Sequence, residues 1–194
     1  PFALLCGVVS AGMMIFHGGI FLMYRTDGNI YARTRKTLLF SGLITLLAFS
    51  ICGVWVANMS GYSIVSAVQP DGLPNPLAKE VVQQTGAWLA NYQRWPLTIS
   101  LPVLAYAGIL VAFLVARAGK PLVAFVFSAL SIVGIIGTFG VSLFPFIMPS
   151  SSDLRSSLTV WDATSSHLTL IVMFFGTIIL LPIVVAYTSW AFRV

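Results

Sequence analysis

The sequence predicts an all-α integral membrane protein in which five transmembrane helices form a helical bundle plus one additional helix. Of its 194 residues, 58% are apolar and only 8% are charged, whereas about a quarter of the residues in a soluble domain are charged. Five apolar runs are long enough to cross a bilayer core of about 30 Å, which takes about 20 residues of helix. Helices are expected because lipid offers no hydrogen-bond partner to an unpaired backbone.

The predicted spans are residues 2–24, 37–57, 97–116, 121–147 and 163–192. We expect them to belong to one membrane domain covering residues 1–194. The chain begins Pro-Phe-Ala, without Met and without a charged segment before the first apolar run, and we therefore expect it to be part of a longer chain. Cys6 and Cys52 lie inside apolar runs and are expected to be small buried side chains without a disulfide.

The charged residues predict an orientation. Seven basic residues fall on one side of the predicted spans: Arg25, Arg33, Arg35, Lys36, Arg117, Lys120 and Arg193. Three fall on the other side: Lys79, Arg94 and Arg155. By the positive-inside rule the first residue lies outside and the chain ends in the cytoplasm. This distribution also favours a membrane protein over a nucleic-acid-binding protein as the explanation of the net charge of +5.

The long connection over residues 58–96 is expected on the outer side, with a short surface helix over residues 76–93. Asn75 is the candidate N-cap and Pro76 the first helical residue. Leu77, Val81, Trp88 and Tyr92 recur at spacings that put them on one helical face. The alternative is a solvated helix in the loop, away from the membrane surface.

His17 is the one ionisable side chain well inside a predicted span, since no Asp, Glu, Lys or Arg lies away from a span end. Three roles are open for it: a hydrogen-bonded place in a polar network, proton or quinone handling, and axial ligation of haem iron. His167, near the start of the last span, is expected to be a surface side chain. We find no pattern of a catalytic nucleophile or a metal-ligand set.

The segment that joins the last two spans carries the other candidate residues. Pro145 and Pro149 predict the end of the fourth helix. Asp162 is predicted to cap the N-terminus of the last helix, because a carboxylate there accepts backbone N–H bonds and meets the positive end of the helix dipole. Trp161 is predicted to be an interfacial anchor.

The chain resembles subunit II of the cytochrome bd quinol oxidases. Its C-terminal signature is matched by FPFIMPSS, SLTVWDATSSHLTL and IVMFFGTIILLPIVVAYTSWAF. Upstream matches are PFALLCGVVSAGM, YRTDGNIYARTRK, CGVWV and NPLAKEVVQQTGAWLANY, in the order and spacing of the family. The resemblance covers essentially the whole chain.

The resemblance implies a haem-free subunit of a bacterial inner-membrane terminal oxidase that oxidises ubiquinol or menaquinol and reduces dioxygen to water. It implies a subunit of nine helices, of which this chain is the C-terminal part with the last five. Haem b, haem d and the quinol-oxidation loop would belong to subunit I, so this chain would ligate no cofactor. A small single-helix accessory subunit and membrane lipids are further expected partners, and nucleic acid is not.

Two other functions were weighed. Half of a secondary transporter would carry broken helices and charged residues near the membrane midplane. Only Pro102 and Pro182 interrupt the predicted helices, and neither has a charge nearby. A structural membrane anchor subunit without a redox partner is the second alternative.

Overall fold

The computed structural model describes residues 1–66 and 75–193, and the chain divides into two compact units. Unit 1 contains residues 1–64 and 81–144, and unit 2 contains residues 65–80 and 145–194. Each unit is described by itself.

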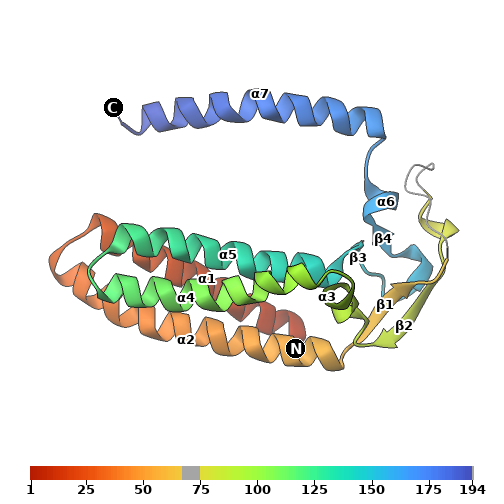
Figure 1. The fold of residues 1–194 in the computed structure, drawn as a ribbon, viewed down its shortest axis with the longest axis horizontal. Helices are drawn as coiled ribbons and strands as arrows, with labels where there is room; N and C mark the ends of the chain where they lie inside the picture. The colour runs from red at the N-terminus through yellow and green to blue at the C-terminus, as the bar shows by residue number, and fades with distance from the viewer. Residues whose placement is uncertain (67–74, 194) are drawn as a thin grey trace. The chain divides into compact units, whose positions relative to one another are not determined.

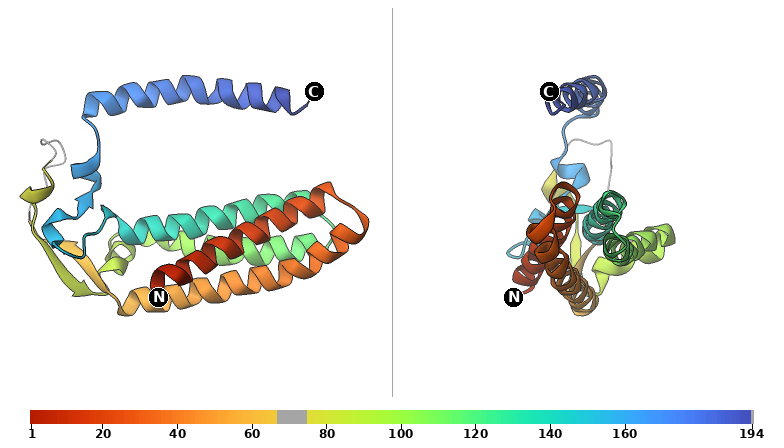
Figure 2. Two further views of the ribbon diagram at one scale, coloured as in Figure 1. Left: turned by 180° about the vertical axis from the view of Figure 1, so that it is seen from behind. Right: turned by 90° about the vertical axis from the view of Figure 1, so that its left-hand side faces the viewer.

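Unit 1 is built on two helical hairpins. Its four long helices are α1 (Phe2–Arg25), α2 (Gly28–Asn58), α4 (Ser100–Arg117) and α5 (Pro121–Leu143). α1 packs along α2 and α4 along α5, while α1 also contacts α5 and α2 contacts α4. Figures 1 and 2 show the two hairpins side by side, with the α1–α2 turn and the α4–α5 turn at the same end.

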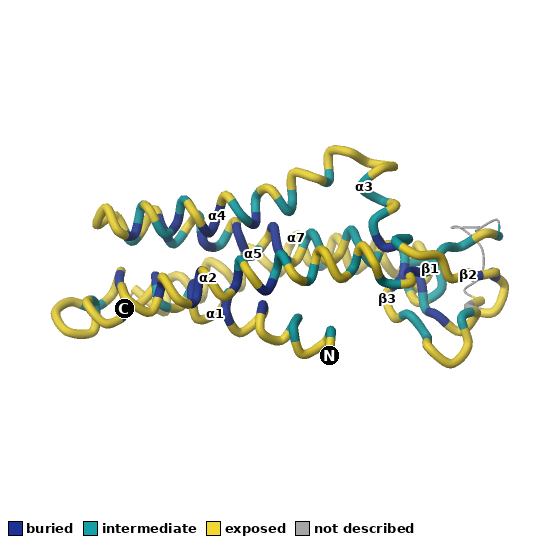
Figure 3. The backbone as a smooth tube through the Cα atoms, turned by 90° about the horizontal axis from the view of Figure 1, so that it is seen from below, coloured by how far each residue is buried: buried dark blue, intermediate teal, exposed yellow. Residues whose placement is uncertain are grey.

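The core of unit 1 lies where these helices face one another. Phe16, Ile20, Leu38 and Ile109 are among its buried apolar side chains, and in Figure 3 the buried stretches recur along each helix rather than covering it. The remaining helix surface is exposed and apolar, which is the pattern expected for helices that face lipid.

Close packing of α4 and α5 depends on small residues. A Cβ added at Gly134 would lie 2.5 Å from the backbone nitrogen of Ala105 and 2.7 Å from the carbonyl oxygen of Leu101. Backbone atoms cannot move aside as a flexible side chain can. The two helices therefore approach as closely as they do because this position has no side chain.

The other end of unit 1 carries a two-stranded antiparallel sheet. β1 (Ser60–Ile64) pairs with β2 (Val81–Thr85), with Ser60 opposite Thr85 and Ile64 opposite Val81. Gly86 follows with a φ of 75°, in the left-handed region that glycine adopts without strain. The chain then forms η2 (Ala87–Leu89), α3 (Ala90–Arg94) and η3 (Pro96–Ile99) before α4.

The predicted surface helix over residues 76–93 is wrong. Its first residues form only a short 3₁₀ turn, η1 (Pro76–Ala78), capped as predicted by the Asn75 side chain, which accepts a hydrogen bond of 3.1 Å from the Leu77 nitrogen. Val81, Val82 and Thr85 are β-branched, favour extended backbone and gain a partner strand in β1. Helical spacing of apolar residues could not reveal that partner.

Unit 2 contains a group of short strands and helical turns and one long helix. β3 (Phe146–Met148) pairs antiparallel with β4 (Leu158–Thr159), η4 (Leu154–Ser156) lies between them, and α6 (Val160–Ala163) follows. The long helix is α7 (His167–Ala191), in which no side chain is buried.

Among the described residues, five helices are long and apolar enough to cross a membrane: α1, α2, residues 96–117, α5 and α7. This confirms a helical membrane protein. Three boundaries differ from the predicted spans by four residues or more: α2 begins at Gly28, α5 ends at Leu143, and α7 begins at His167. α5 ends early because Phe144 precedes Pro145 and takes an extended conformation, with ψ of 134°.

Candidate functional site

His17 is a residue of α1 whose side chain contacts α5. Its Nδ1 atom is 2.7 Å from the hydroxyl of Ser128, which is fully buried. Its ring stacks on Phe125 of the same helix as Ser128, with centroids 4.4 Å apart and an interplanar angle of 27°. One imidazole thus joins the two helical hairpins through a hydrogen bond and a ring contact.

The direction of this hydrogen bond follows from a second one. The Ser128 hydroxyl also lies 2.8 Å from the carbonyl oxygen of Phe125, which can only accept. A hydroxyl has one proton to donate, and the serine gives it to that carbonyl. We therefore assign the donor of this hydrogen bond to the Nδ1–H of His17, with the Ser128 oxygen as acceptor.

Unit 1 also contains a large apolar cavity of about 800 Å³. Residues from α1, α2, α4 and α5 form its wall, and Trp88, Leu89 and Tyr92 of the segment before α4 contribute at one end. The free cysteines Cys6 and Cys52 both lie on the wall. His17 does not line the cavity, so the structure does not bring this candidate residue to it.

Two tyrosine hydroxyls on the cavity wall are bonded to the protein. The Tyr92 hydroxyl donates to the Thr138 carbonyl at 2.8 Å. The Tyr106 hydroxyl shares a hydrogen bond of 2.8 Å with Ser50. With these hydroxyls engaged, the cavity offers mainly hydrocarbon surface, and an apolar molecule is the kind of occupant it fits.

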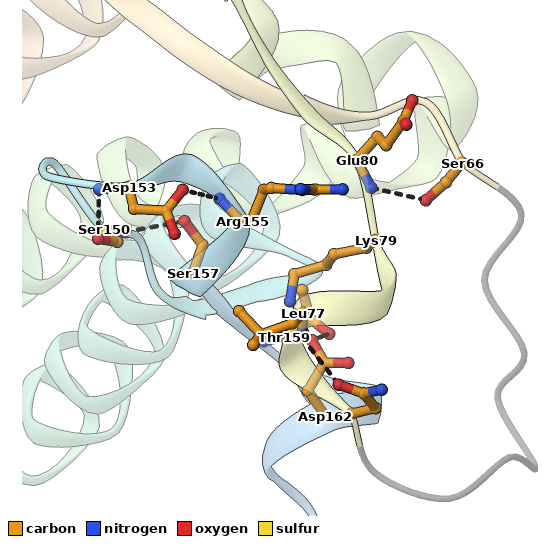
Figure 4. A network of polar contacts seen from close by, with 11 residues as sticks. Ser66, Leu77, Lys79, Glu80, Ser150, Asp153, Arg155, Ser157, Thr159 and Asp162 are labelled. Carbon is orange, nitrogen blue, oxygen red and sulfur yellow. Dashed lines mark hydrogen bonds and ion pairs between the residues drawn. The ribbon is translucent and has the colours of Figure 1, made fainter.

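A buried ion pair with its hydrogen bonds connects the short elements of unit 2 (Figure 4). The Lys79 ammonium lies 2.7 Å from the Asp162 carboxylate, with side-chain exposures of only 5% and 12%. The same carboxylate oxygen accepts hydrogen bonds from the Thr159 hydroxyl at 2.5 Å and the Thr159 nitrogen at 3.3 Å. These contacts therefore connect the residue after η1 to β4 and α6.

The charge state of Asp162 follows from these contacts. Burial alone would raise the pKa of its carboxyl group, because burial disfavours the charged form. Hydrogen bonds from Lys79 and Thr159, together with the Lys79 charge, outweigh burial and lower the pKa below its ordinary value. Asp162 is accordingly a carboxylate at neutral pH.

Asp162 does not cap the long helix α7, contrary to the prediction. The N-cap of α7 is Ser166, whose side chain accepts a hydrogen bond from the Thr169 nitrogen at 3.4 Å. Asp162 instead lies in the first turn of α6, where it forms a reciprocal capping box with Thr159. Trp161 is half-buried beside it in α6, and its anchoring role stays a prediction.

The serine-rich segment before α6 is held by its own side chains, as Figure 4 also shows. Asp153 caps η4 by accepting hydrogen bonds from the Arg155 nitrogen at 3.1 Å and the Ser156 hydroxyl at 2.8 Å. The Ser157 hydroxyl accepts a hydrogen bond of 2.9 Å from the Ser150 nitrogen. These hydrogen bonds hold the short segment between α5 and α6 in a defined conformation.

Two functional contacts were missed by the sequence. Ser128 is the partner of His17 although 111 positions separate them, and Lys79 is the partner of Asp162 across 83 positions. The available signal was a polar residue in each case: a serine within an apolar helix and a lysine in a loop with few charges. Within the described residues, no group of three or more His, Cys, Asp or Glu side chains could hold a metal ion.

Comparison with known proteins gives a consistent result. Residues 1–194 match the family model described as cytochrome bd terminal oxidase subunit II. The chain is 46% identical over 193 residues to cytochrome bd-I ubiquinol oxidase subunit 2 of Escherichia coli K12, covering 99% of this chain and 51% of that protein. It is 40% identical over 192 residues to a probable cytochrome oxidase subunit 2 of Haemophilus influenzae, with coverages of 99% and 51%. The chain thus spans about half the length of these relatives.

Proposed function

Because this chain belongs to the cytochrome bd terminal oxidase subunit II family, we propose that it serves as a haem-free part of a quinol:oxygen oxidoreductase. The complex would lie in the bacterial inner membrane, oxidise ubiquinol or menaquinol and reduce dioxygen to water. Haem b and haem d would be held by subunit I. The Escherichia coli relative is named a ubiquinol oxidase subunit, which favours ubiquinol as the substrate of the complex.

The observation that carries this proposal is the chemistry of the helix interiors in unit 1. No Asp, Glu, Lys or Arg lies away from a helix end in α1, α4 and α5 or within residues 37–58 of α2. Their one histidine, His17, is engaged with Ser128 and Phe125. Because its imidazole is packed against these two residues, the chain's own residues fit a scaffold better than a redox centre.

An apolar scaffold contributes to the reaction through the environment it creates. Helices without charged side chains keep water and protons away from a neighbouring redox centre, because an ion in hydrocarbon is strongly disfavoured. Dioxygen is apolar and enters such a region readily. The subunit would therefore support assembly of subunit I and shield its haems, without supplying catalytic residues.

The test is to purify the full-length subunit with and without co-expressed subunit I and record reduced-minus-oxidised absorption spectra. We expect haem b and haem d signals only when subunit I is present, and loss of haem d from subunit I when this subunit is deleted. Haem bound to the subunit alone would contradict the proposal. A fully active oxidase lacking it would do the same, whereas a transporter or a simple anchor would bring no haem in either preparation.

A further inference from the structure

One end of unit 1 carries an unusual concentration of positive charge. Where the α1–α2 turn and the α4–α5 turn lie, six basic residues are accompanied by a single carboxylate, that of Asp27. We call these six residues the basic end: Arg25, Arg33, Arg35, Lys36, Arg117 and Lys120. All six side chains are exposed.

The two hairpins are in contact near these turns through Arg35 of α2. Its Nη2 atom donates a hydrogen bond of 3.4 Å to the carbonyl oxygen of Arg117, the last residue of α4. Three residues later in the same turn stands Lys120. Charges from both hairpins are therefore gathered at one place, although 82 positions separate Arg35 from Arg117.

Aromatic rings fix the depth of two of these charges in the membrane. The Arg25 guanidinium lies 5.1 Å from the ring centroid of Tyr24 and 5.9 Å from that of Phe21. The Arg117 guanidinium lies 5.6 Å from the ring of Phe113. Arginine stacked on aromatic rings at the end of a membrane-spanning helix is held at the level of the lipid headgroups.

No ion pair among the described residues neutralises this charge. Across residues 1–66 and 75–193 the ion pair found is that of Lys79 with Asp162, which belongs to unit 2. The cations of the basic end thus repel one another unless an anion is supplied from outside. Exposed apolar side chains such as Leu22, Leu114 and Leu122 continue from the basic end along the helices, which suits acyl chains below a headgroup.

We propose that the basic end binds the phosphate headgroup of an anionic phospholipid, with Arg35, Arg117 and Lys120 at the centre of the site. The lipid phosphate would join the two helical hairpins by pairing with cations from both turns. Guanidinium groups suit this role because they form charge-assisted, bidentate hydrogen bonds to phosphate. The proposal does not depend on the redox role of the subunit.

The test is native mass spectrometry of the full-length subunit in its purified complex, titrated with dioleoyl phosphatidylglycerol or dioleoyl phosphatidylcholine. We expect the wild-type protein to bind phosphatidylglycerol more tightly than phosphatidylcholine. Each basic residue near a membrane surface contributes a factor of about five to binding of anionic lipid. The Arg35→Gln/Arg117→Gln/Lys120→Gln variant should therefore bind phosphatidylglycerol about a hundredfold more weakly and retain fewer lipid molecules.

Three controls sharpen the result. Arg94→Gln, at the other end of unit 1, should leave phosphatidylglycerol binding unchanged, and Arg35→Lys should preserve most of it. Millimolar inorganic phosphate should not displace the lipid; displacement would indicate a site for free phosphate and overturn the proposal. Equal binding by the triple variant, or equal affinity for the two lipids, would also overturn it.

A salt series on the unchanged complex covers the case in which the triple variant fails to assemble. Affinity for phosphatidylglycerol should fall as ionic strength rises, because the pairing of exposed charges is screened. Affinity independent of salt contradicts the proposal.

Discussion

At the scale of single residues, His17 shows how one polar side chain is accommodated between apolar helices. Its Nδ1–H donates to Ser128 and its ring stacks on Phe125, so one ring nitrogen and one ring face are used within the protein. These contacts support a place in a hydrogen-bonded network, the first of the three roles open from the sequence. They leave Nε2 without a partner among the described hydrogen bonds.

Substitution of His17 tests this role. His17→Ala removes the inter-hairpin hydrogen bond and the ring contact, and we expect the free energy of unfolding to fall by about 1–2 kcal/mol. The haem spectrum of the complex should not change. Detergent-driven unfolding of the full-length subunit measures the first quantity, and reduced-minus-oxidised spectra measure the second.

A double-mutant cycle isolates the contact itself. Ser128→Ala and the His17→Ala/Ser128→Ala pair should give a coupling free energy of about 0.5–1.5 kcal/mol. Loss of a haem signal in His17→Ala with Ser128→Ala unaffected would instead show that His17 serves a cofactor.

Asp162 illustrates a different situation, in which a largely buried carboxylate is paired with a cation and a hydroxyl group. Asp162→Asn removes the negative charge that faces Lys79, and we expect a local loss of about 3 kcal/mol. Backbone amides around β4 and α6 should then exchange with deuterium about a hundredfold faster. The matched control is Asp153→Asn, an exposed carboxylate of the same segment, which should cost about 1 kcal/mol or less.

The lowered pKa of Asp162 predicts how pH acts on this segment. A depressed pKa in the folded chain means that the ion pair contributes stability above the ordinary pKa of 3.8 and loses it as pH falls through the folded-state value. Amide protection around α6 should stay constant from pH 8 to about pH 5 and fall only in stronger acid. Loss of protection near pH 6 would assign the effect to another group.

At the scale of elements, the contact between α4 and α5 depends on the absence of a side chain at Gly134. Gly134→Ala places a methyl group 2.5 Å from the Ala105 nitrogen, and we expect a loss of about 1–3 kcal/mol and a melting temperature lower by several degrees. Gly140→Ala in the same helix is the matched control, since an added Cβ there meets nothing within 4 Å. Size-exclusion chromatography after heating measures both.

Gly140→Ala should be neutral or slightly stabilising, because alanine favours helix over glycine. Equal melting temperatures for Gly134→Ala and Gly140→Ala would show that α4 and α5 are farther apart than the structure places them.

The sequence predicted the long helices well because their signal is local. A run of apolar residues needs no distant partner to be recognised, and the predicted ends at residues 24 and 116 lie one residue from the observed ends at Arg25 and Arg117. The start of α2 was placed nine residues late, since Arg33, Arg35 and Lys36 do not satisfy an apolar criterion although they are good helix formers.

Features that depend on distant residues were not predicted. β1 and β2 pair across the segment that contains residues 65–80, and no periodicity in either strand identifies the other. The prediction that Asp162 caps the last helix is wrong, because Ser166 is the N-cap of α7 and Asp162 pairs with Thr159 in α6. Local capping patterns overlap here within eight residues, and tertiary contacts choose between them.

At the scale of the whole molecule, the surface is organised for lipid rather than water. α7 has a mean hydropathy of 2.8 in its most apolar window, and the structure buries none of its side chains. A helix that is apolar on all sides belongs in a membrane or against another apolar chain. Charge is correspondingly confined to the end regions of the helices and to the segments that connect them.

The last prediction concerns the orientation of the chain in the membrane. The basic end should face the cytoplasm, because loops rich in Lys and Arg are retained there. In a background with Cys6 and Cys52 replaced by serine, Asn29→Cys and Gln84→Cys place exposed thiols at opposite ends of unit 1. A membrane-impermeant maleimide should label Gln84→Cys in intact spheroplasts and Asn29→Cys only after lysis.

The reverse labelling would invert the assigned orientation and move the basic end to the outer leaflet. That outcome would also change the source of the anionic lipid, since the cytoplasmic leaflet carries the negative surface potential that attracts clusters of Lys and Arg. Orientation and lipid binding are therefore linked through the same six cations: the charges that select the cytoplasmic side during insertion are the charges left unpaired in the folded unit, and a headgroup from that side can neutralise them.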